Sequence, residues 1–330
     1  MIATRLTRRL GIRHPIVQAG MGGAARAELV AAVSNAGGLG TLGMIRQSPN
    51  AIRDQIRRTR ALTTAPFGVN IVPTSVPPEG FEAQLAVCLE ERVPVLSLFW
   101  CDAEPYVERA HAAGMLVMHQ VGSAEEARRA VAGGVDVIVA QGFEAGGHVR
   151  GEVGVLPLVT AVVDAAGSVP IAAAGGIADG RGLAAVLALG ADGVWVGTRF
   201  VAAEESEAHP DYKKRLVAAR ETDTVYTELF HIGWPEHSPH RVLRNALTES
   251  VPLPAGPVAR LRVGDRTVDI PAFAAPGPTI HTEGQTDLMA NYAGQGVAAI
   301  REVLPAREIV ERMVAEAEAI IRDRMPAFIR

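Results

Sequence analysis

The chain has 330 residues, of which 48% are hydrophobic and 21% charged, so it can bury a sizeable core in one large domain or in one domain with an added lobe. A formal net charge of −4 gives no overall basic surface for nucleic acid or an anionic membrane. Only two cysteines, Cys88 and Cys101, argue against a disulfide scaffold and a clustered metal site. With no signal-peptide core and no bilayer-spanning apolar run, we expect a soluble cytoplasmic protein.

Short apolar runs alternate with amphipathic stretches over the first 200 residues. There are eight such runs, at residues 14–18, 38–42, 67–71, 95–99, 115–119, 135–140, 170–174 and 193–197. Near-continuous apolar strands indicate a sheet covered on both faces, and the spacing leaves room for one helix between each pair. Eight such units predict a (β/α)₈ TIM barrel, with a doubly wound open sheet as the alternative.

Helix boundaries are marked by capping residues. Ser123 precedes a helical stretch with an acid at its third position, and Asp179 begins another that ends at Gly190. After Leu304-Pro305, apolar residues recur at helical spacing as far as Ile321, which predicts a last helix packed back on the barrel.

The pattern changes after about Pro210. Residues 220–250 are predicted to be helical, and residues 251–283, rich in Pro, Gly and Thr, to form irregular structure or a flap. We therefore expect a barrel formed by residues 1–215 and 300–330, and a smaller, mainly helical lobe inserted at residues 216–299 that caps the substrate.

The stretch from Gln141 to His148 directly follows the sixth apolar run. Gly146 and Gly147 open the backbone for close approach of a flat or phosphorylated ligand. His148 then stands just past a strand end, where an imidazole can abstract a proton or bind a substrate anion. A loop histidine that only caps backbone groups is the alternative.

Two glycine-rich turns follow the seventh and eighth runs, where barrel enzymes commonly hold phosphate. The first contains Gly175 and Gly176 and precedes a helix whose N–H groups and dipole favour an anion. The second contains Gly197 and Thr198. Both turns predict a phosphate site, although ordinary βα turns have similar sequences.

Residues at other strand ends suit a flat heteroaromatic ring. Ala19, Gly20 and Met21 follow the first strand and leave space over the barrel mouth. Asn70 and Gln120 end the third and fifth strands, and their amides can both donate and accept hydrogen bonds. Together these residues favour a ring-shaped cofactor over isolated loop-capping amides.

Three further motifs are less decisive. Tyr292 and Gln295, near the end of the lobe, could cap a cofactor or form a helix-terminating turn. Residues 38–43 spell G-x-G-x-x-G, but a helical stretch precedes them and the glycines lie within a strand, so a dinucleotide site is rejected. His231, His237 and His240 have no metal-site spacing, and we expect polar contacts between lobe and barrel there.

Together these motifs resemble the nitronate monooxygenase family, formerly called 2-nitropropane dioxygenases. The resemblance covers about two-thirds of the chain and is carried by residues 15–21, 35–40, 67–70, 141–148, 174–180 and 190–200. It implies a TIM barrel with non-covalent FMN. The same barrel is similar to FMN-dependent enoyl-acyl-carrier-protein reductases and to certain NADH:quinone reductases.

The resemblance also implies roles for single residues. His148 falls on the catalytic histidine of the family. The cofactor would be held by Ala19, Gly20, Met21, Asn70, Gln120, Gln141, Gly146, Gly147, Gly175, Gly176, Gly197, Thr198, Tyr292 and Gln295. In the family a nitronate reduces FMN and O₂ completes the oxidation, with release of nitrite and a carbonyl compound.

Two other functions stay open from the sequence, an NAD(P)H-dependent flavin reductase of quinones or enoyl thioesters, and a barrel that binds FMN without turnover. Three departures from the family pattern bear on this. Residues 71–78 match only in part, Gln120 stands where some relatives carry lysine, and residues 225–283 match no member. We expect a small-molecule substrate and O₂ as partners, and a homodimer is left open.

Overall fold

The computed structural model describes residues 2–250 and 256–329. Its largest sheet has eight parallel strands in the order β1-β9-β8-β6-β5-β4-β3-β2. A parallel bridge between Val17 and Leu39 joins the two edges, so the sheet closes into a barrel. The predicted TIM barrel is therefore confirmed. Its strands are β1 (Ile16–Gln18), β2 (Gly40–Gly43), β3 (Phe67–Ile71), β4 (Val95–Leu98), β5 (Leu116–Val121), β6 (Val137–Gln141), β8 (Ile171–Ala174) and β9 (Gly193–Val196).

Side chains alternate between the two faces of the barrel wall, as the pleat of a strand requires. Val137 and Val139 of β6 belong to the cluster inside the barrel, together with Trp195 of β9. Ile138 of β6 and Val194 of β9 belong to the larger cluster between strands and helices. Both faces are buried, which explains why the strands appear in the sequence as continuous apolar runs.

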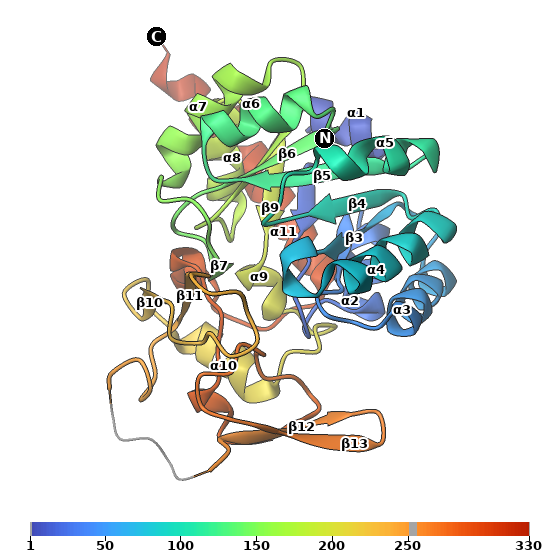
Figure 1. Ribbon diagram of the computed structural model, residues 1–330. Coiled ribbons are helices and arrows are strands. Elements are labelled where there is room, and N and C mark those ends of the chain that lie inside the picture. Colours follow the sequence, from blue (N-terminus) through green and yellow to red (C-terminus); the bar gives the residue numbers. More distant parts are fainter. Residues whose placement is uncertain (1, 251–255, 330) are drawn as a thin grey trace.

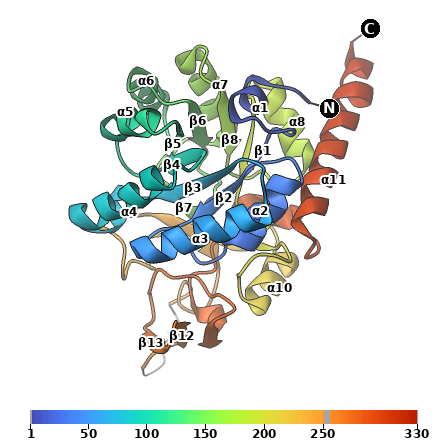
Figure 2. The same ribbon diagram turned by 90° about the vertical axis from the view of Figure 1, so that its right-hand side faces the viewer.

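Helices surround the barrel, as Figures 1 and 2 show. The long helix α11 lies along one side against α8, and its Glu316 carboxylate accepts a hydrogen bond from the Gly180 N–H at 2.8 Å. Ser123 and Asp179 cap α6 and α8 as predicted. The α-helices are α1 (Arg5–Leu10), α2 (Ala27–Asn35), α3 (Pro49–Leu62), α4 (Pro78–Glu90), α5 (Glu104–Ala112), α6 (Ala124–Ala132), α7 (Val155–Ala166), α8 (Gly180–Ala188), α9 (Thr198–Val201), α10 (Pro210–Ala218) and α11 (Ala306–Ala319).

Short helix α1 closes the barrel at the amino ends of the strands. Leu6 and Leu10 are buried in the cluster inside the barrel. Arg5 pairs with Asp192 just before β9 at 2.8 Å, and Arg9 pairs with Asp136 just before β6. Only the carboxyl ends of the strands are left for a ligand.

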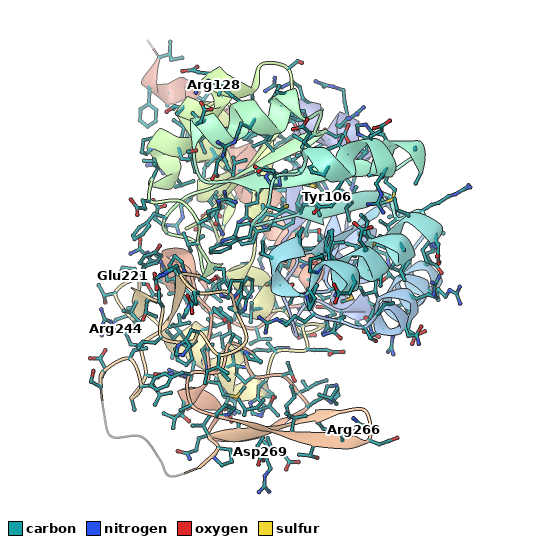
Figure 3. The ribbon with its side chains drawn as sticks, viewed as in Figure 1. Tyr106, Arg128, Glu221, Arg244, Arg266 and Asp269 are labelled. Carbon is teal, nitrogen blue, oxygen red and sulfur yellow. The ribbon has the colours of Figure 1, made fainter. Side chains whose placement is uncertain are left out.

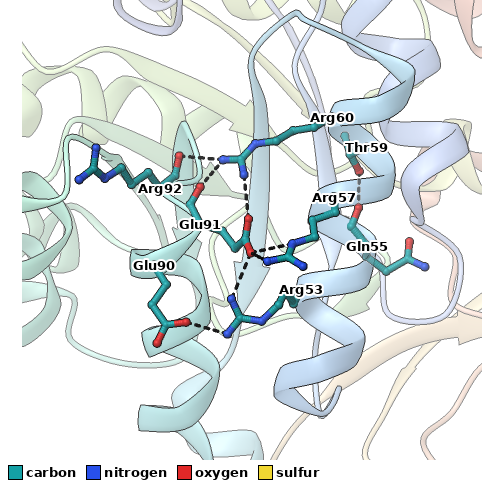
Figure 4. Close-up of polar contacts among 8 residues, drawn as sticks. All are labelled: Arg53, Gln55, Arg57, Thr59, Arg60, Glu90, Glu91 and Arg92. Carbon is teal, nitrogen blue, oxygen red and sulfur yellow. Dashed lines mark hydrogen bonds and ion pairs between the residues drawn. The ribbon is translucent and has the colours of Figure 1, made fainter.

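An ion-pair cluster fastens α3 to the end of α4 on the outside of the barrel (Figure 4). The Glu91 carboxylate, 10% exposed, lies 3.1 Å from Arg53, 2.9 Å from Arg57 and 2.9 Å from Arg60. Among the described residues, Glu90, whose side chain is 60% exposed, pairs only with Arg53. One carboxylate therefore carries most of this contact between neighbouring helices.

The inserted segment was predicted to be mainly helical, and this prediction is wrong. In the described part of residues 220–299, the regular elements are strands and 3₁₀ turns. Strands β10 (Thr224–Thr227) and β11 (His240–Leu243) form an antiparallel sheet with β7 (Gly147–His148) of the barrel loop. The prediction failed because Thr, Val and Tyr in β10 favour extended structure and the apolar positions had no true helical period.

The expectation of irregular structure or a flap for residues 251–283 is wrong for residues 259–270, which are mostly strand, and correct for residues 271–281, which have no regular element; residues 251–255 lie outside the described residues. Strands β12 (Ala259–Val263) and β13 (Arg266–Ile270) form a hairpin that β14 (Thr282–Gly284) extends. The hairpin projects at the foot of the view in Figure 1, and Figure 3 shows Arg266 and Asp269 extending from it. The described 3₁₀ and π segments are η1 (Pro73–Ser75), η2 (Thr286–Leu288), η3 (Gln295–Ala299), η4 (Ile320–Arg324) and η5 (Pro326–Phe328).

A separate hydrophobic cluster supports the lobe. It includes Phe230, Val242, Val258, Ile270 and Met289. The lobe thus has its own small core while β11 ties it to the barrel. None of the described helices is both long enough and apolar enough to cross a membrane.

Candidate active site

A cavity of about 770 Å³ lies between the carboxyl ends of the barrel strands and the lobe. Its volume is in the range of small-molecule and cofactor sites. Most of the residues proposed from the sequence line it, namely Ala19, Gly20, Met21, Asn70, Gln120, Gln141, Gly146, Gly147, His148, Gly197, Thr198 and Tyr292.

Three proposed residues do not line this cavity. Gly175 and Gly176 have φ values of +102° and +69°, which favour glycine. A Cβ at Gly296 would clash with the Gly176 carbonyl oxygen, so the missing side chain of Gly296 lets its backbone pass close to this turn. Gln295 is exposed, and its backbone N–H donates to the Glu144 carbonyl at 2.9 Å. The segment after Tyr292 therefore packs on the barrel loops through its backbone.

Strand β7 holds His148 against the lobe. The main chain of His148 is opposite His240 of β11 in the antiparallel ladder. Its imidazole stacks on Trp234 with ring centroids 3.5 Å apart and meets the edge of Trp100 at 5.9 Å. The Tyr292 ring lies 5.6 Å away. An aromatic cage formed by barrel and lobe together thus orients the imidazole.

The His148 imidazole is neutral near pH 7. Burial lowers its pKa well below the ordinary value, and the neighbouring His240 and Arg46 lower it further. His240 is itself in a defined tautomer, because its Nδ1 lies 3.0 Å from the Ser238 carbonyl oxygen and its Nε2 accepts from the Phe230 N–H at 3.2 Å. The Nε2 atom of His148 is covered and has no partner among the described residues.

Two side-chain amides also leave a buried atom unpaired at the cavity. Gln141 donates through Nε2 to the His148 carbonyl at 3.0 Å, which leaves its Oε1 as a free acceptor. Gln120 has no acceptor for its Nε2 in the described part of the chain. Asn70 donates to the carbonyl of Ser97 at 3.1 Å. Buried polar atoms are normally paired, so an unpaired donor and acceptor fit a ring that carries both N–H and carbonyl groups.

The backbone around the predicted phosphate site is only partly as expected. The first N–H groups of α8 are already occupied, because Asp179 accepts from Gly182 and Glu316 from Gly180. The dipole of this helix was expected to bind the anion, but its end already carries two carboxylates. By contrast, the N–H groups of Gly197 and Thr198 meet no acceptor in the described structure, and both residues line the cavity. Free backbone donors there fit a phosphate group.

Sequence reasoning missed several residues at the site. Trp234 comes from the lobe, and Arg46 and Trp100 have φ values of +55° and +61°. Non-glycine residues in this left-handed region are uncommon and often lie at functional sites. No signal in the composition marks a left-handed backbone conformation, and neither Arg46 nor Trp100 lies in a glycine-rich motif. A general inspection of aromatic residues after strand ends could have found Trp100.

The outer part of the cavity is bordered by charged side chains and by the hairpin tip. Arg26, Arg58 and Arg262 line it, with Glu207 as an acidic neighbour. Val263 and Gly264 of the hairpin also contribute. Within the described residues, no group of three or more His, Cys, Asp and Glu side chains could hold a metal ion.

Comparison with known proteins identifies the family. The nitronate monooxygenase family model matches residues 3–77 and 72–316, so the chain belongs to that family. A nitronate monooxygenase of Pseudomonas aeruginosa is 36% identical over 357 aligned positions, which cover 94% of this chain and 98% of that protein. The chain is an oxidoreductase, and enzymes of this family are flavoproteins.

Two other similar proteins carry different names. A (3aS,4S,5R,7aS)-5-hydroxy-7a-methyl-1-oxo-octahydro-1H-indene-4-carboxyl-CoA dehydrogenase of Mycobacterium tuberculosis is 40% identical over 252 residues, which cover 76% of this chain and 68% of that protein. The structure of FabK from Thermotoga maritima has a TM-score of 0.83 at 34% identity, with full coverage of both chains. Proteins similar to this chain therefore carry names for different activities, and the residues of the cavity must distinguish among them.

Proposed function

We propose that the protein is an FMN-dependent nitronate monooxygenase, which oxidises alkyl nitronates with O₂ to a carbonyl compound and nitrite. The observation that carries the proposal is His148, a neutral imidazole that lines a cavity of about 770 Å³ together with Gln120 and Gln141, and whose Nε2 has no partner among the described residues. The similarity to the P. aeruginosa nitronate monooxygenase, which extends over nearly the whole chain, supports the same activity.

FMN fits the groups that the cavity presents. Gln120 and Gln141 would bind the polar edge of the ring, and Ala19, Gly20 and Met21 would leave space along it. The N–H groups of Gly197 and Thr198 would hold the phosphate, with Gly175 and Gly176 shaping the neighbouring turn. FMN supplies the capacity to take electrons from the substrate and pass them to O₂.

The protein's own residues bind the substrate and handle the proton. Because His148 is neutral, its Nε2 can accept the proton from the carbon next to the nitro group of a neutral nitroalkane, which yields the nitronate that is then oxidised. A neutral imidazole is less suited to hold a nitronate by charge, so the base role is favoured over the imidazolium role. Trp234 and Tyr292, from the lobe, would exclude water from this position. In this proposal, residues 216–299 act as the substrate-capping part.

The purified holoenzyme tests the proposal. Its visible spectrum should contain the bands of oxidised flavin, and heat-released cofactor should be FMN. Under anaerobic conditions, ethylnitronate or propionate 3-nitronate should bleach these bands, and in air each should drive O₂ uptake with nitrite release. If neither nitronate reduces the bound flavin, the proposal is wrong.

A second function is an NAD(P)H-dependent reductase or a dehydrogenase of thioester substrates. It is supported by the similarity to the M. tuberculosis carboxyl-CoA dehydrogenase and by the basic side chains of Arg58 and Arg262 at the cavity, which could meet a phosphorylated carrier. Rapid bleaching of the flavin by NADH or NADPH, with no bleaching by nitronates, would favour this function over the first.

A further inference from the structure

Arg46 lies in the turn between β2 and α3 and lines the cavity. Its φ of +55° is in the left-handed region, which is unfavourable for a non-glycine residue. This backbone conformation directs the long cationic side chain of Arg46 from the barrel toward the lobe. The surrounding contacts are consistent with a fixed position.

Contacts from both parts of the protein hold the Arg46 guanidinium. Its Nε donates to the Ser75 carbonyl at 3.3 Å, and its Cζ lies 5.5 Å from the centroid of the Trp234 ring. The lobe chain passes close by, since a Cβ at Gly233 would come within 2.7 Å of Nη1. Gly233 has a φ of +93°, and its missing side chain leaves room for the guanidinium. Both terminal nitrogens are left without a hydrogen-bond acceptor among the described residues.

The charge of Arg46 is not balanced by a carboxylate. In the described part of the chain no acidic side chain pairs with it, whereas Arg58 pairs with Glu28. Arg26, also at the cavity, has Glu207 as an acidic neighbour and donates to the Gly43 carbonyl at 2.6 Å. Burial lowers the pKa of Arg46, but a guanidinium stays protonated at neutral pH. A half-buried cation without a counter-charge favours an anionic ligand.

Trp234 connects this cation to the proposed base, because the same ring stacks on His148 and lies against Arg46. We propose that Arg46 binds the anionic oxygens of the nitronate, while His148 serves only to take the proton from a neutral nitroalkane. The choice of a nitronate as that anion rests on the function proposed above, and any planar oxyanion of similar size would meet the same donors. Arg46, which comes from a barrel turn, then binds the negative charge, and His148, which comes from a strand end, accepts the proton.

Anion binding can be measured without turnover. Nitrate is a planar oxyanion that cannot donate electrons to the flavin, and it should bind the holoenzyme with a saturable change in the flavin spectrum. In Arg46→Gln the dissociation constant should rise about 10- to 100-fold, since hydrogen bonds to charged groups contribute about 1.5 to 3 kcal/mol. The dissociation constant of Arg46→Lys for nitrate should lie between those of the parent enzyme and Arg46→Gln. Unchanged nitrate binding in Arg46→Gln, or no saturable binding by the parent enzyme, overturns the proposal.

Kinetics provide the second measurement. Arg46→Gln should raise the KM for ethylnitronate by a similar factor and change kcat by less than about threefold, because a ground-state contact is lost. If the parent enzyme binds nitrate through Arg46 but does not oxidise any nitronate, the proposed function fails and the anion site stands. Arg57→Gln is the matched control, since it removes a positive charge from an exposed face of α3 outside the cavity.

The pH profile distinguishes a charge role from a purely structural one. The charged or titratable groups facing His148 are Arg46 from the β2–α3 turn, His240 from β11 and Tyr292 from the segment before η3. Loss of the Arg46 charge should raise the pKa of His148, so the acid limb of kcat/KM for a neutral nitroalkane should move to higher pH in Arg46→Gln and stay in place in Arg46→Lys. An acid limb that does not move in Arg46→Gln contradicts the proposal.

Discussion

The barrel and the lobe meet at one cavity but are built differently. The barrel strands are parallel, buried on both faces and closed at their amino ends by α1. The lobe consists of short antiparallel strands with exposed side chains on the projecting hairpin. Backbone groups and amides that suit a cofactor come from the barrel, whereas Trp234 and the hairpin tip come from the lobe. The comparison predicts that the barrel determines cofactor binding and that the lobe determines substrate choice.

Replacement of His148 by Asn should have the largest effect. Loss of a positioned base should lower kcat/KM about 10²- to 10⁴-fold, most strongly for neutral nitroalkanes that must lose a proton. Flavin content should stay unchanged, because no cofactor-binding role is assigned to the imidazole. Steady-state O₂ uptake and the absorbance ratio of flavin to protein measure the two effects.

The control for this variant is His237→Gln, at a lobe histidine whose side chain is 87% exposed. It should retain the parent kcat/KM within about twofold, since exposed substitutions away from a site have small effects. Equal losses in both variants would mean that His148 acts through lobe structure and not at the cavity.

Removal of the Trp234 ring tests whether the lobe tunes a barrel residue. In Trp234→Ala the His148 imidazole loses its stacked neighbour and becomes hydrated, so its pKa should rise toward the ordinary value. The parent enzyme should keep the neutral, active imidazole to a pH well below 6.5, whereas the variant should lose activity at a higher pH. At neutral pH kcat/KM should fall about fivefold, as aromatic contacts of this kind contribute about 1 kcal/mol.

The pH profile of kcat/KM measures this effect, and Trp234→Phe keeps an aromatic ring as its control. An acid limb at the same pH in Trp234→Ala and in the parent enzyme would show that burial by the lobe does not set the His148 pKa. The barrel would then determine the protonation state of His148 by itself, and the lobe would not tune the base.

The barrel was predictable because each strand is a local signal. An apolar run such as 135–140 is buried on both faces, so its sequence carries the pattern without help from distant residues. His148 and Gln141 followed from their place after that run. Arg46 could not be predicted in the same way, because its role depends on a left-handed backbone turn and on Gly233, nearly 190 positions away.

The lobe was mispredicted for a related physical reason. Its strands are short and pair with distant segments, such as β11 with β7, so little of their stability is local. The β12–β13 hairpin is an exception that could have been recognised. Gly264-Asp265 lies between two runs with alternating polarity, which is a strong hairpin signal.

On the barrel side, Glu91→Ala should lower stability without changing activity. Three arginines of α3 lose their shared carboxylate, which should cost about 1 to 2 kcal/mol, less than a fully buried pair because solvent screens the cluster. Urea unfolding followed by far-UV circular dichroism measures it. Glu90→Ala, beside it and mostly exposed, should show no measurable change. A fall in kcat in Glu91→Ala would show that outer helices also influence the site.

The smallest expected effect concerns the hairpin and provides the finest test of the lobe's role. Val263 is 57% exposed and lines the outer cavity, on the same face as Leu261 and opposite Arg266 in the ladder. Val263→Asp should raise the KM for 1-hexylnitronate about threefold, since a partial apolar contact contributes well under 1 kcal/mol, and should leave the KM for ethylnitronate unchanged. Val268→Asp makes the same substitution at another exposed position of the hairpin, one that does not line the cavity. If both variants change the two KM values equally, the charge acts at a distance and the hairpin does not contact the substrate chain.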